Sequence, residues 1–125
     1  MDARILLVED DPSIREVTAI GLRNAGFTVE TADDGRAGIE RFEAADFDLV
    51  LLDVMLPKID GFALLKQLRA AKRTARVPVM IVSSFDRDKD VARGMELGAN
   101  DYVIKPLMEY QFLGCVARFA PQKDE

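Results

Sequence analysis

Residues 48–57 read Asp48-Leu49-Val50-Leu51-Leu52-Asp53-Val54-Met55-Leu56-Pro57, a short apolar run that ends at a carboxylate. An unbroken apolar run of this length predicts a central strand of a parallel sheet, buried on both faces. Asp53 stands where that strand should end, and open parallel sheets bind their ligands just beyond the carboxyl ends of their strands. Because aspartate is also a common turn residue, the other strands must show whether Asp53 has partners.

Four other apolar segments predict strands, and stretches with helical spacing of apolar residues separate them. The predicted strands span residues 4–8, 27–32, 48–53, 78–82 and 101–105, and the helices after them begin near Pro12, Gly35, Gly61, Val91 and Met108. Strands that alternate with helices predict a parallel sheet covered on both faces, with right-handed crossovers. We therefore predict an α/β fold, a doubly wound (βα)5 parallel five-stranded sheet in the flavodoxin-like order 2-1-3-4-5.

The first and last helices carry apolar residues whose burial bears on function. Helix one is predicted to start at Pro12, with Asp11 as its N-cap, and to end at Gly26. Its predicted buried face follows spacings of three and four: Ile14, Val17, Thr18, Gly21, Leu22 and Ala25. In the last helix, a second set either completes the core or leaves apolar surface for a partner: Tyr110, Leu113 and Phe119.

Length, charge and composition limit the classes of function. The 125 residues predict one domain over residues 1–120 and a loose tail over 121–125. A net charge of −5 argues against direct binding of nucleic acid. The single cysteine, Cys115, excludes an internal disulfide and fits a cytoplasmic location, and no apolar run approaches the ~20 residues of a membrane span. The chain has no histidine, so no histidine base, ligand or phosphocarrier lies within it.

Polar side chains stand at the carboxyl ends of four of the five predicted strands. They are Glu9, Asp10 and Asp11 at the first, Asp53 at the third, Ser83 and Ser84 at the fourth, and Lys105, followed by Pro106, at the fifth. In the order 2-1-3-4-5 these strands are neighbours about 4.8 Å apart, so the groups should meet at one edge of the sheet. Each has an ordinary explanation by itself: acids at a helix start, a serine cap or a solvated lysine. Their joint placement predicts a site.

The acids in this set predict a metal ion. Carboxylates this close repel one another, and a hard divalent cation relieves the repulsion. We predict Mg²⁺, with Mn²⁺ as an alternative. Asp10 and Asp53 are the expected direct ligands, Glu9 acts from behind them or through water, and the backbone carbonyl of Met55 is a further ligand.

A metal ion beside Asp53 would make this carboxylate a nucleophile toward phosphorus, because it neutralises the repulsion between carboxylate and phosphoryl oxygens. Lys105 and the serines Ser83 and Ser84 would then hold the phosphoryl oxygens. A cis bond before Pro106 would aim Lys105 inward.

At this point the residues resemble a known family, the receiver domain of bacterial two-component response regulators. The motifs that carry the resemblance are Ile5-Leu6-Leu7-Val8-Glu9-Asp10-Asp11, Leu56-Pro57-Lys58-Ile59-Asp60-Gly61, Gly98-Ala99-Asn100-Asp101-Tyr102 and Lys105-Pro106. The resemblance extends from about Arg4 to Leu107. It implies Mg²⁺-dependent transfer of a phosphoryl group to Asp53 from a histidine kinase or a histidine phosphotransfer protein.

The resemblance also implies a signalling switch, which is a regulatory domain that catalyses its own phosphorylation and dephosphorylation rather than an enzyme. Ser83 would move toward the phosphoryl group, and Tyr102 would rotate inward. The face made by helix four, strand five and helix five would change and control an output protein or an effector domain outside this chain. Tyr102 can equally be a half-buried strand residue. Cys115 replaces an arginine that DNA-binding members often use in dimer ion pairs, which argues against that mode of dimerisation; whether phosphorylation drives another homodimer stays open.

Three other interpretations are weighed against this one. A haloacid dehalogenase-type phosphatase needs a second acid at the position of Met55. A flavodoxin-type cofactor binder needs hydroxyls and amides, not acids, in its first loop. The third alternative is a receiver-like interaction scaffold that acts without phosphorylation, and the complete set of site residues argues against it. Because no effector segment follows residue 125, either a single-domain regulator or part of a longer protein is expected.

Overall fold

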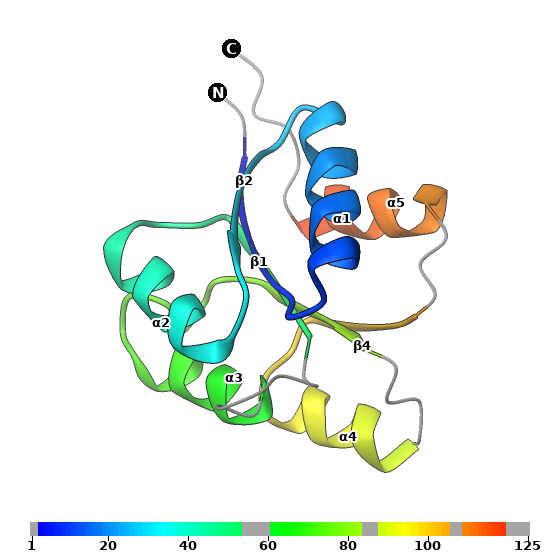
Figure 1. The fold of residues 1–125 in the computed structure, drawn as a ribbon. Coiled ribbons are helices and arrows are strands. Elements are labelled where there is room, and N and C mark those ends of the chain that lie inside the picture. Colours follow the sequence, from blue (N-terminus) through cyan, green and yellow to red (C-terminus); the bar gives the residue numbers. More distant parts are fainter. Residues whose placement is uncertain (1–2, 54–60, 84–87, 106–108, 120–125) are drawn as a thin grey trace.

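The computed structural model describes residues 3–53, 61–83, 88–105 and 109–119 as a five-stranded parallel sheet with helices on both faces (Figure 1). The elements are β1 (Arg4–Val8), α1 (Pro12–Asn24), β2 (Thr28–Ala32), α2 (Gly35–Ala44), β3 (Leu49–Leu52), α3 (Gly61–Ala70), β4 (Val79–Ser83), α4 (Asp88–Glu96), β5 (Asp101–Ile104) and α5 (Glu109–Phe119). The strand order β2-β1-β3-β4-β5 confirms the predicted fold class and topology.

The side chains of the central strands alternate between two apolar clusters, one on each face of the sheet. In β3, Leu49 and Leu51 join the cluster that contains residues of α1 and α5, whereas Val50 and Leu52 join the cluster of α2 and α3. Figure 1 shows α1 and α5 on one side of the sheet and α2, α3 and α4 on the other. Because both faces of β3 are covered, its sequence is apolar without interruption.

The ends of the helices follow the signals in the sequence. The Asp11 side chain accepts hydrogen bonds from the backbone N–H groups of Ser13 and Ile14, which makes it the N-cap of α1 as predicted. Gly26 and Gly98 follow α1 and α4 with φ angles of 99° and 104°. Side chains other than glycine rarely adopt this left-handed conformation, so both glycines end their helices as expected.

The predicted buried face of α1 is wrong in part. Ala19 and Leu22 are buried, but the side chains of Ile14, Val17 and Ile20 are 38%, 71% and 48% exposed. The helix carries two apolar stripes, and only the one with the small Ala19 side chain faces the sheet. Because a helix that packs on a sheet buries one face only, the second stripe stays at the surface.

Two of the three apolar residues singled out in the last helix complete the core. Leu113 and Phe119 pack partly buried against the cluster that contains α1 residues. The side chains of Tyr110 and Cys115, and residues 120–125 with the predicted tail, lie outside the described part of the chain. Among the helices that the structure describes, none has the length and apolar character that crossing a membrane requires.

Candidate functional site

The parallel register of the sheet brings the ends of β1, β3, β4 and β5 to one edge. Val8 pairs with Leu52, and the Asp53 N–H donates to the Val8 carbonyl at 3.0 Å, so Glu9 and Asp53 leave neighbouring strands side by side. On the other side, the Lys105 N–H donates to the Ser83 carbonyl at 2.9 Å. The predicted residues Glu9, Asp53, Ser83 and Lys105 therefore lie along one edge.

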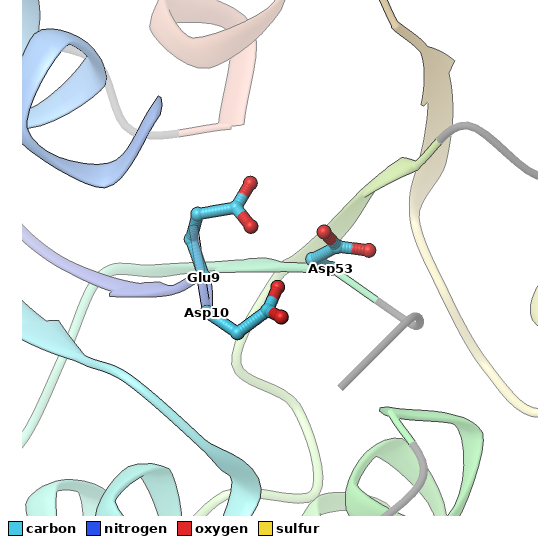
Figure 2. A group of neighbouring side chains, drawn as sticks. All are labelled: Glu9, Asp10 and Asp53. Atoms are coloured by element: carbon cyan, nitrogen blue, oxygen red, sulfur yellow. The ribbon is translucent and has the colours of Figure 1, made fainter. Parts of the chain in front are cut away.

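Three carboxylates converge at this edge. One carboxylate oxygen from each of Glu9, Asp10 and Asp53 lies within 4.8 Å of the other two. Figure 2 shows the three carboxyl groups directed into one common space. Glu9 and Asp53 are 3% and 5% exposed, whereas Asp10 is exposed. The cluster therefore has two buried members and one member open to solvent.

Lys105 joins the two buried carboxylates. Its Nζ lies 2.6 Å from Oε1 of Glu9 and 2.9 Å from Oδ2 of Asp53. The Lys105 side chain is only 14% exposed, so solvent screens this arrangement weakly. The sequence places Lys105 at this edge, but it does not reveal that one ammonium group contacts both acids.

The charges of the site change the pKa values of its members. Burial raises the pKa of the Glu9 carboxyl from 4.5 to about 7; the hydrogen bond from Lys105 opposes this shift, and the Asp53 carboxylate adds to it. Burial lowers the pKa of Lys105, but the hydrogen bonds to Glu9 and Asp53 outweigh burial and raise it overall. Lys105 is therefore a permanent cation between two acids that repel each other.

The donor set fits a hard divalent cation. Three carboxylates meet with one ammonium group, and oxygen ligands with excess negative charge are what Mg²⁺ selects. Asp10, at the open side of the cluster, has room for water ligands that Mg²⁺ usually keeps. Met55, Ser84 and Pro106 lie outside the described residues, so their roles stay predictions.

Ser83 and Tyr102, the two residues of the expected switch, lie in β4 and β5. Ser83 is fully buried at the end of β4. Tyr102 is half-buried in β5, and α4 packs closely over it at Gly94. A Cβ atom at Gly94 would lie 2.7 Å from Cδ1 of Ile81 and 3.1 Å from Cδ2 of Tyr102. Helix α4 can approach the sheet at this point because residue 94 has no side chain.

Gly94→Ala is therefore expected to lower the free energy of unfolding by about 1 kcal/mol. The new methyl group overpacks against Ile81 in β4 and Tyr102 in β5, which costs about 1–3 kcal/mol and outweighs the helix propensity that alanine adds, about 0.5–1 kcal/mol. Chemical denaturation of both proteins measures this difference.

Two helical glycines serve as controls for that substitution. A Cβ atom at Gly21 in α1 or at Gly114 in α5 would meet no tertiary neighbour within 4 Å among the described residues. Gly21→Ala and Gly114→Ala should each raise stability by about 0.5–1 kcal/mol through helix propensity alone. A Gly94→Ala protein that gains stability like these two would contradict the close approach of α4.

The structure adds two residues to the site that were not predicted from the sequence. Nη1 of Arg15 donates hydrogen bonds to the backbone carbonyls of Glu9 and Asp10. Ile14 lines a small cavity together with Glu9 and Asp53. The sequence shows only that Arg15 is a basic residue one turn into the helix that follows the acids. It does not show which backbone carbonyls this long side chain reaches.

Comparison with known families and curated proteins gives a consistent result. A family model described as the response regulator receiver domain matches residues 5–116. The chain is 43% identical over 115 residues to the transcriptional activator protein IrlR of Burkholderia pseudomallei, covering 92% of this chain and 48% of IrlR. It is 37% identical over 121 residues to the DNA-binding dual master transcriptional regulator RpaA of Synechocystis, covering 97% of this chain and 50% of RpaA. The chain spans about half the length of these relatives.

Solved structures give the same fold. The chemotaxis protein CheY4 of Vibrio cholerae aligns with a TM-score of 0.90 at 29% identity, covering 95% of this chain and 99% of CheY4. The receiver domain of a Pseudomonas aeruginosa sensor histidine kinase aligns with a TM-score of 0.88 at 29% identity, covering 95% of this chain and 98% of that domain. That structure was solved with a magnesium ion coordinated in its active-site cleft.

Proposed function

This chain belongs to the family of response regulator receiver domains, and from that premise we propose that it is a phosphoacceptor switch whose acceptor is Asp53. The observation that carries the proposal is the Asp53 carboxylate, buried at the end of β3 between Lys105 and two further acids. Because the chain belongs to this family, we prefer this function to the two alternatives of a haloacid dehalogenase-type phosphatase and a flavodoxin-type cofactor binder. We assign the domain to residues 1–120, followed by the tail at 121–125.

In the proposed reaction a carboxylate oxygen of Asp53 attacks the phosphorus of a phosphohistidine on a partner protein. The new P–O bond forms as the P–N bond breaks, and the electron pair of the P–N bond stays on the departing imidazole. The donor histidine must come from a histidine kinase or a histidine phosphotransfer protein, since this chain contains none. Water later attacks the same phosphorus, the P–O bond to Asp53 breaks, and inorganic phosphate leaves. This step restores the Asp53 carboxylate, so the switch resets itself.

The chain's own residues prepare this step. Lys105 contacts Asp53 already and can exchange its bond to Glu9 for one to a phosphoryl oxygen. Asp10 and Asp53, with Glu9 beside them, would hold Mg²⁺ or, alternatively, Mn²⁺. When bound, the ion supplies the charge that lets a carboxylate and a phosphoryl group approach each other. The magnesium ion described in the Pseudomonas relative supports this assignment.

The surface next to the site suits a protein donor. Ile14 lines the same small cavity as Asp53, and the exposed stripe of α1 continues from it through Val17. A donor protein that places its imidazole against Asp53 must also cover the neighbouring surface of α1. We therefore include the α1 stripe in the donor interface, because apolar exposed groups of this kind mark interaction surfaces.

The output side of the proposal involves α4, β5 and α5. A phosphoryl group on Asp53 would draw Ser83 toward it and change the position of Tyr102 beneath α4. That change would control a separate output protein, an effector domain beyond this chain or a homodimer of the domain. With a net charge of −5, the chain itself is not proposed to bind nucleic acid. A reducing cytoplasmic setting is part of the proposal, since one cysteine cannot form an internal disulfide.

Intact mass spectrometry tests the function directly. The protein is incubated with acetyl phosphate or with a panel of phosphorylated histidine kinases, with Mg²⁺ and with EDTA. We expect the mass of one phosphoryl group to be added in Mg²⁺ and not in EDTA. If neither acetyl phosphate nor any kinase transfers a phosphoryl group, the acceptor function is contradicted and the unphosphorylated scaffold is favoured.

A further inference from the structure

Arg15 reaches back from α1 to the turn that carries two of the three acids. Its backbone N–H donates to the Asp11 carbonyl at 2.8 Å, within the first turn of the helix. Its side-chain Nη1 donates to the Glu9 carbonyl at 3.0 Å and to the Asp10 carbonyl at 3.3 Å. The side chain is half-buried; its hydrogen bond to Glu9 is partly buried, and its hydrogen bond to Asp10 lies at the surface.

The two carbonyls belong to the two peptide planes on either side of Asp10. Fixing both planes fixes the backbone dihedral angles of Asp10, and these angles set the direction of its Cα–Cβ bond. The neighbouring positions are held by other groups: the Glu9 N–H donates to the Ala32 carbonyl, and Asp11 caps α1. Arg15 therefore acts on the part of the turn where the Asp10 side chain starts.

Asp10 is the member of the cluster that most needs such support. It is exposed, so burial does not hold its side chain as it holds Glu9 and Asp53. It also carries the same charge as these two neighbours, and repulsion favours any conformation that moves it outward. A side chain that is held in place before the metal arrives loses less conformational freedom when it binds.

We propose that Arg15 is a positioning residue for metal binding: it holds the backbone around Asp10 so that the Asp10 carboxylate faces Asp53 and Glu9. The inference rests on the proposed function, because the metal site is part of it. Arg15 is not proposed to touch the metal or the phosphoryl group.

The direction in which Mg²⁺ affinity changes when Arg15 is replaced distinguishes this positioning role from a simple charge effect. A cation near three carboxylates repels Mg²⁺, so removal of the Arg15 charge alone would tighten Mg²⁺ binding. Loss of a positioning contact would weaken it instead. Groups that orient metal ligands from outside typically change metal affinity by about tenfold or more when they are removed.

The experiment compares Mg²⁺ dissociation constants, measured by titration calorimetry at pH 8, where Glu9 with its pKa of about 7 is ionised. Arg15→Met, which removes the donor and the charge, is expected to weaken Mg²⁺ binding by about tenfold. Arg15→Lys keeps both a charge and donors and should lose less affinity. Thermal unfolding in EDTA reports separately on stability without metal.

Arg23→Met is the matched control. Arg23 lies in the same helix and also donates to a backbone carbonyl, that of Val29 at 2.9 Å, but it lies at the other end of α1 from the acids. We expect Arg23→Met to bind Mg²⁺ like the wild type. Unchanged or tighter binding by Arg15→Met, or an equal loss in both methionine variants, would overturn the inference. A wild-type protein that binds no Mg²⁺ would instead overturn the metal site of the proposed function.

Discussion

Asp53→Asn is expected to abolish phosphoryl uptake, because a neutral amide oxygen is too weak a nucleophile to attack phosphorus. The substitution keeps the shape of the side chain and leaves an oxygen that can still accept a hydrogen bond from Lys105. In the wild type, Nζ of Lys105 lies 2.9 Å from Oδ2 of Asp53. It also removes a charge that raises the pKa of Glu9. The folded protein should therefore be at least as stable as the wild type in EDTA, so loss of uptake cannot be attributed to unfolding.

Asp46→Asn provides the control for that result. Asp46 precedes β3 at the opposite end of the strand from Asp53, and its side chain is 86% exposed in an ion pair with Arg73. Its phosphoryl uptake in Mg²⁺, measured by intact mass, should equal that of the wild type. Undiminished uptake by the Asp53→Asn protein would show that another residue accepts the phosphoryl group.

The second large effect is expected for Lys105→Met. Loss of one preorganised charge at a phosphoryl-transfer site typically slows the reaction by about a hundredfold, which a time course of phosphoryl uptake would show. The buried carboxylates of Glu9 and Asp53 would also lose their shared cation. Removing one partner of such a buried arrangement lowers the free energy of unfolding by about 3 kcal/mol. Denaturation in EDTA at pH 8 measures this loss.

The stability that Lys105→Met loses should be smaller at low pH and smaller in the presence of Mg²⁺. The Lys105 hydrogen bond lowers the pKa of Glu9, so the variant should have a Glu9 pKa above the wild-type value of about 7. A carboxyl whose pKa is raised in the folded state keeps a proton that the unfolded chain has released. Stability then falls as the pH rises from the unfolded pKa to the folded pKa. The variant should therefore be closer to the wild type at pH 6 than at pH 8.

Mg²⁺ supplies the missing positive charge, so it should raise the melting temperature of Lys105→Met more than that of the wild type. Arg73→Met is the control, because the exposed pair between Arg73 and Asp46 should contribute no more than about 1 kcal/mol. Equal melting shifts in Mg²⁺ for Lys105→Met and the wild type would contradict the role of Lys105 as the cation that balances the acids.

Much of this architecture can be predicted from the sequence because it depends on local patterns. The unbroken apolar run of β3 requires a strand covered on both faces, and alternating strands and helices require parallel pairing. Parallel pairing in turn places every strand's carboxyl end at one edge. Glu9, Asp53 and Lys105 could therefore be assigned to one site, although 96 residues separate the first from the last.

Other features depend on which atoms meet across elements, and no sequence period encodes that. Helix α1 has two apolar stripes, and only packing against the sheet shows that Ala19 and Leu22 are buried while Val17 is exposed. The same holds for Gly94, whose importance lies in the Tyr102 ring beneath it.

The fold, the strand order and the meeting of Glu9, Asp53, Ser83 and Lys105 at one edge could be predicted from the sequence, because these follow from periodicity and from the ends of the strands. The folded structure was needed to show that Lys105 contacts both buried acids and that Arg15 hydrogen-bonds to the carbonyls of Glu9 and Asp10. The physical reason is that long charged side chains have many rotamers of similar energy in an isolated chain. Which rotamer is selected depends on the acceptors and the burial that the folded neighbours provide.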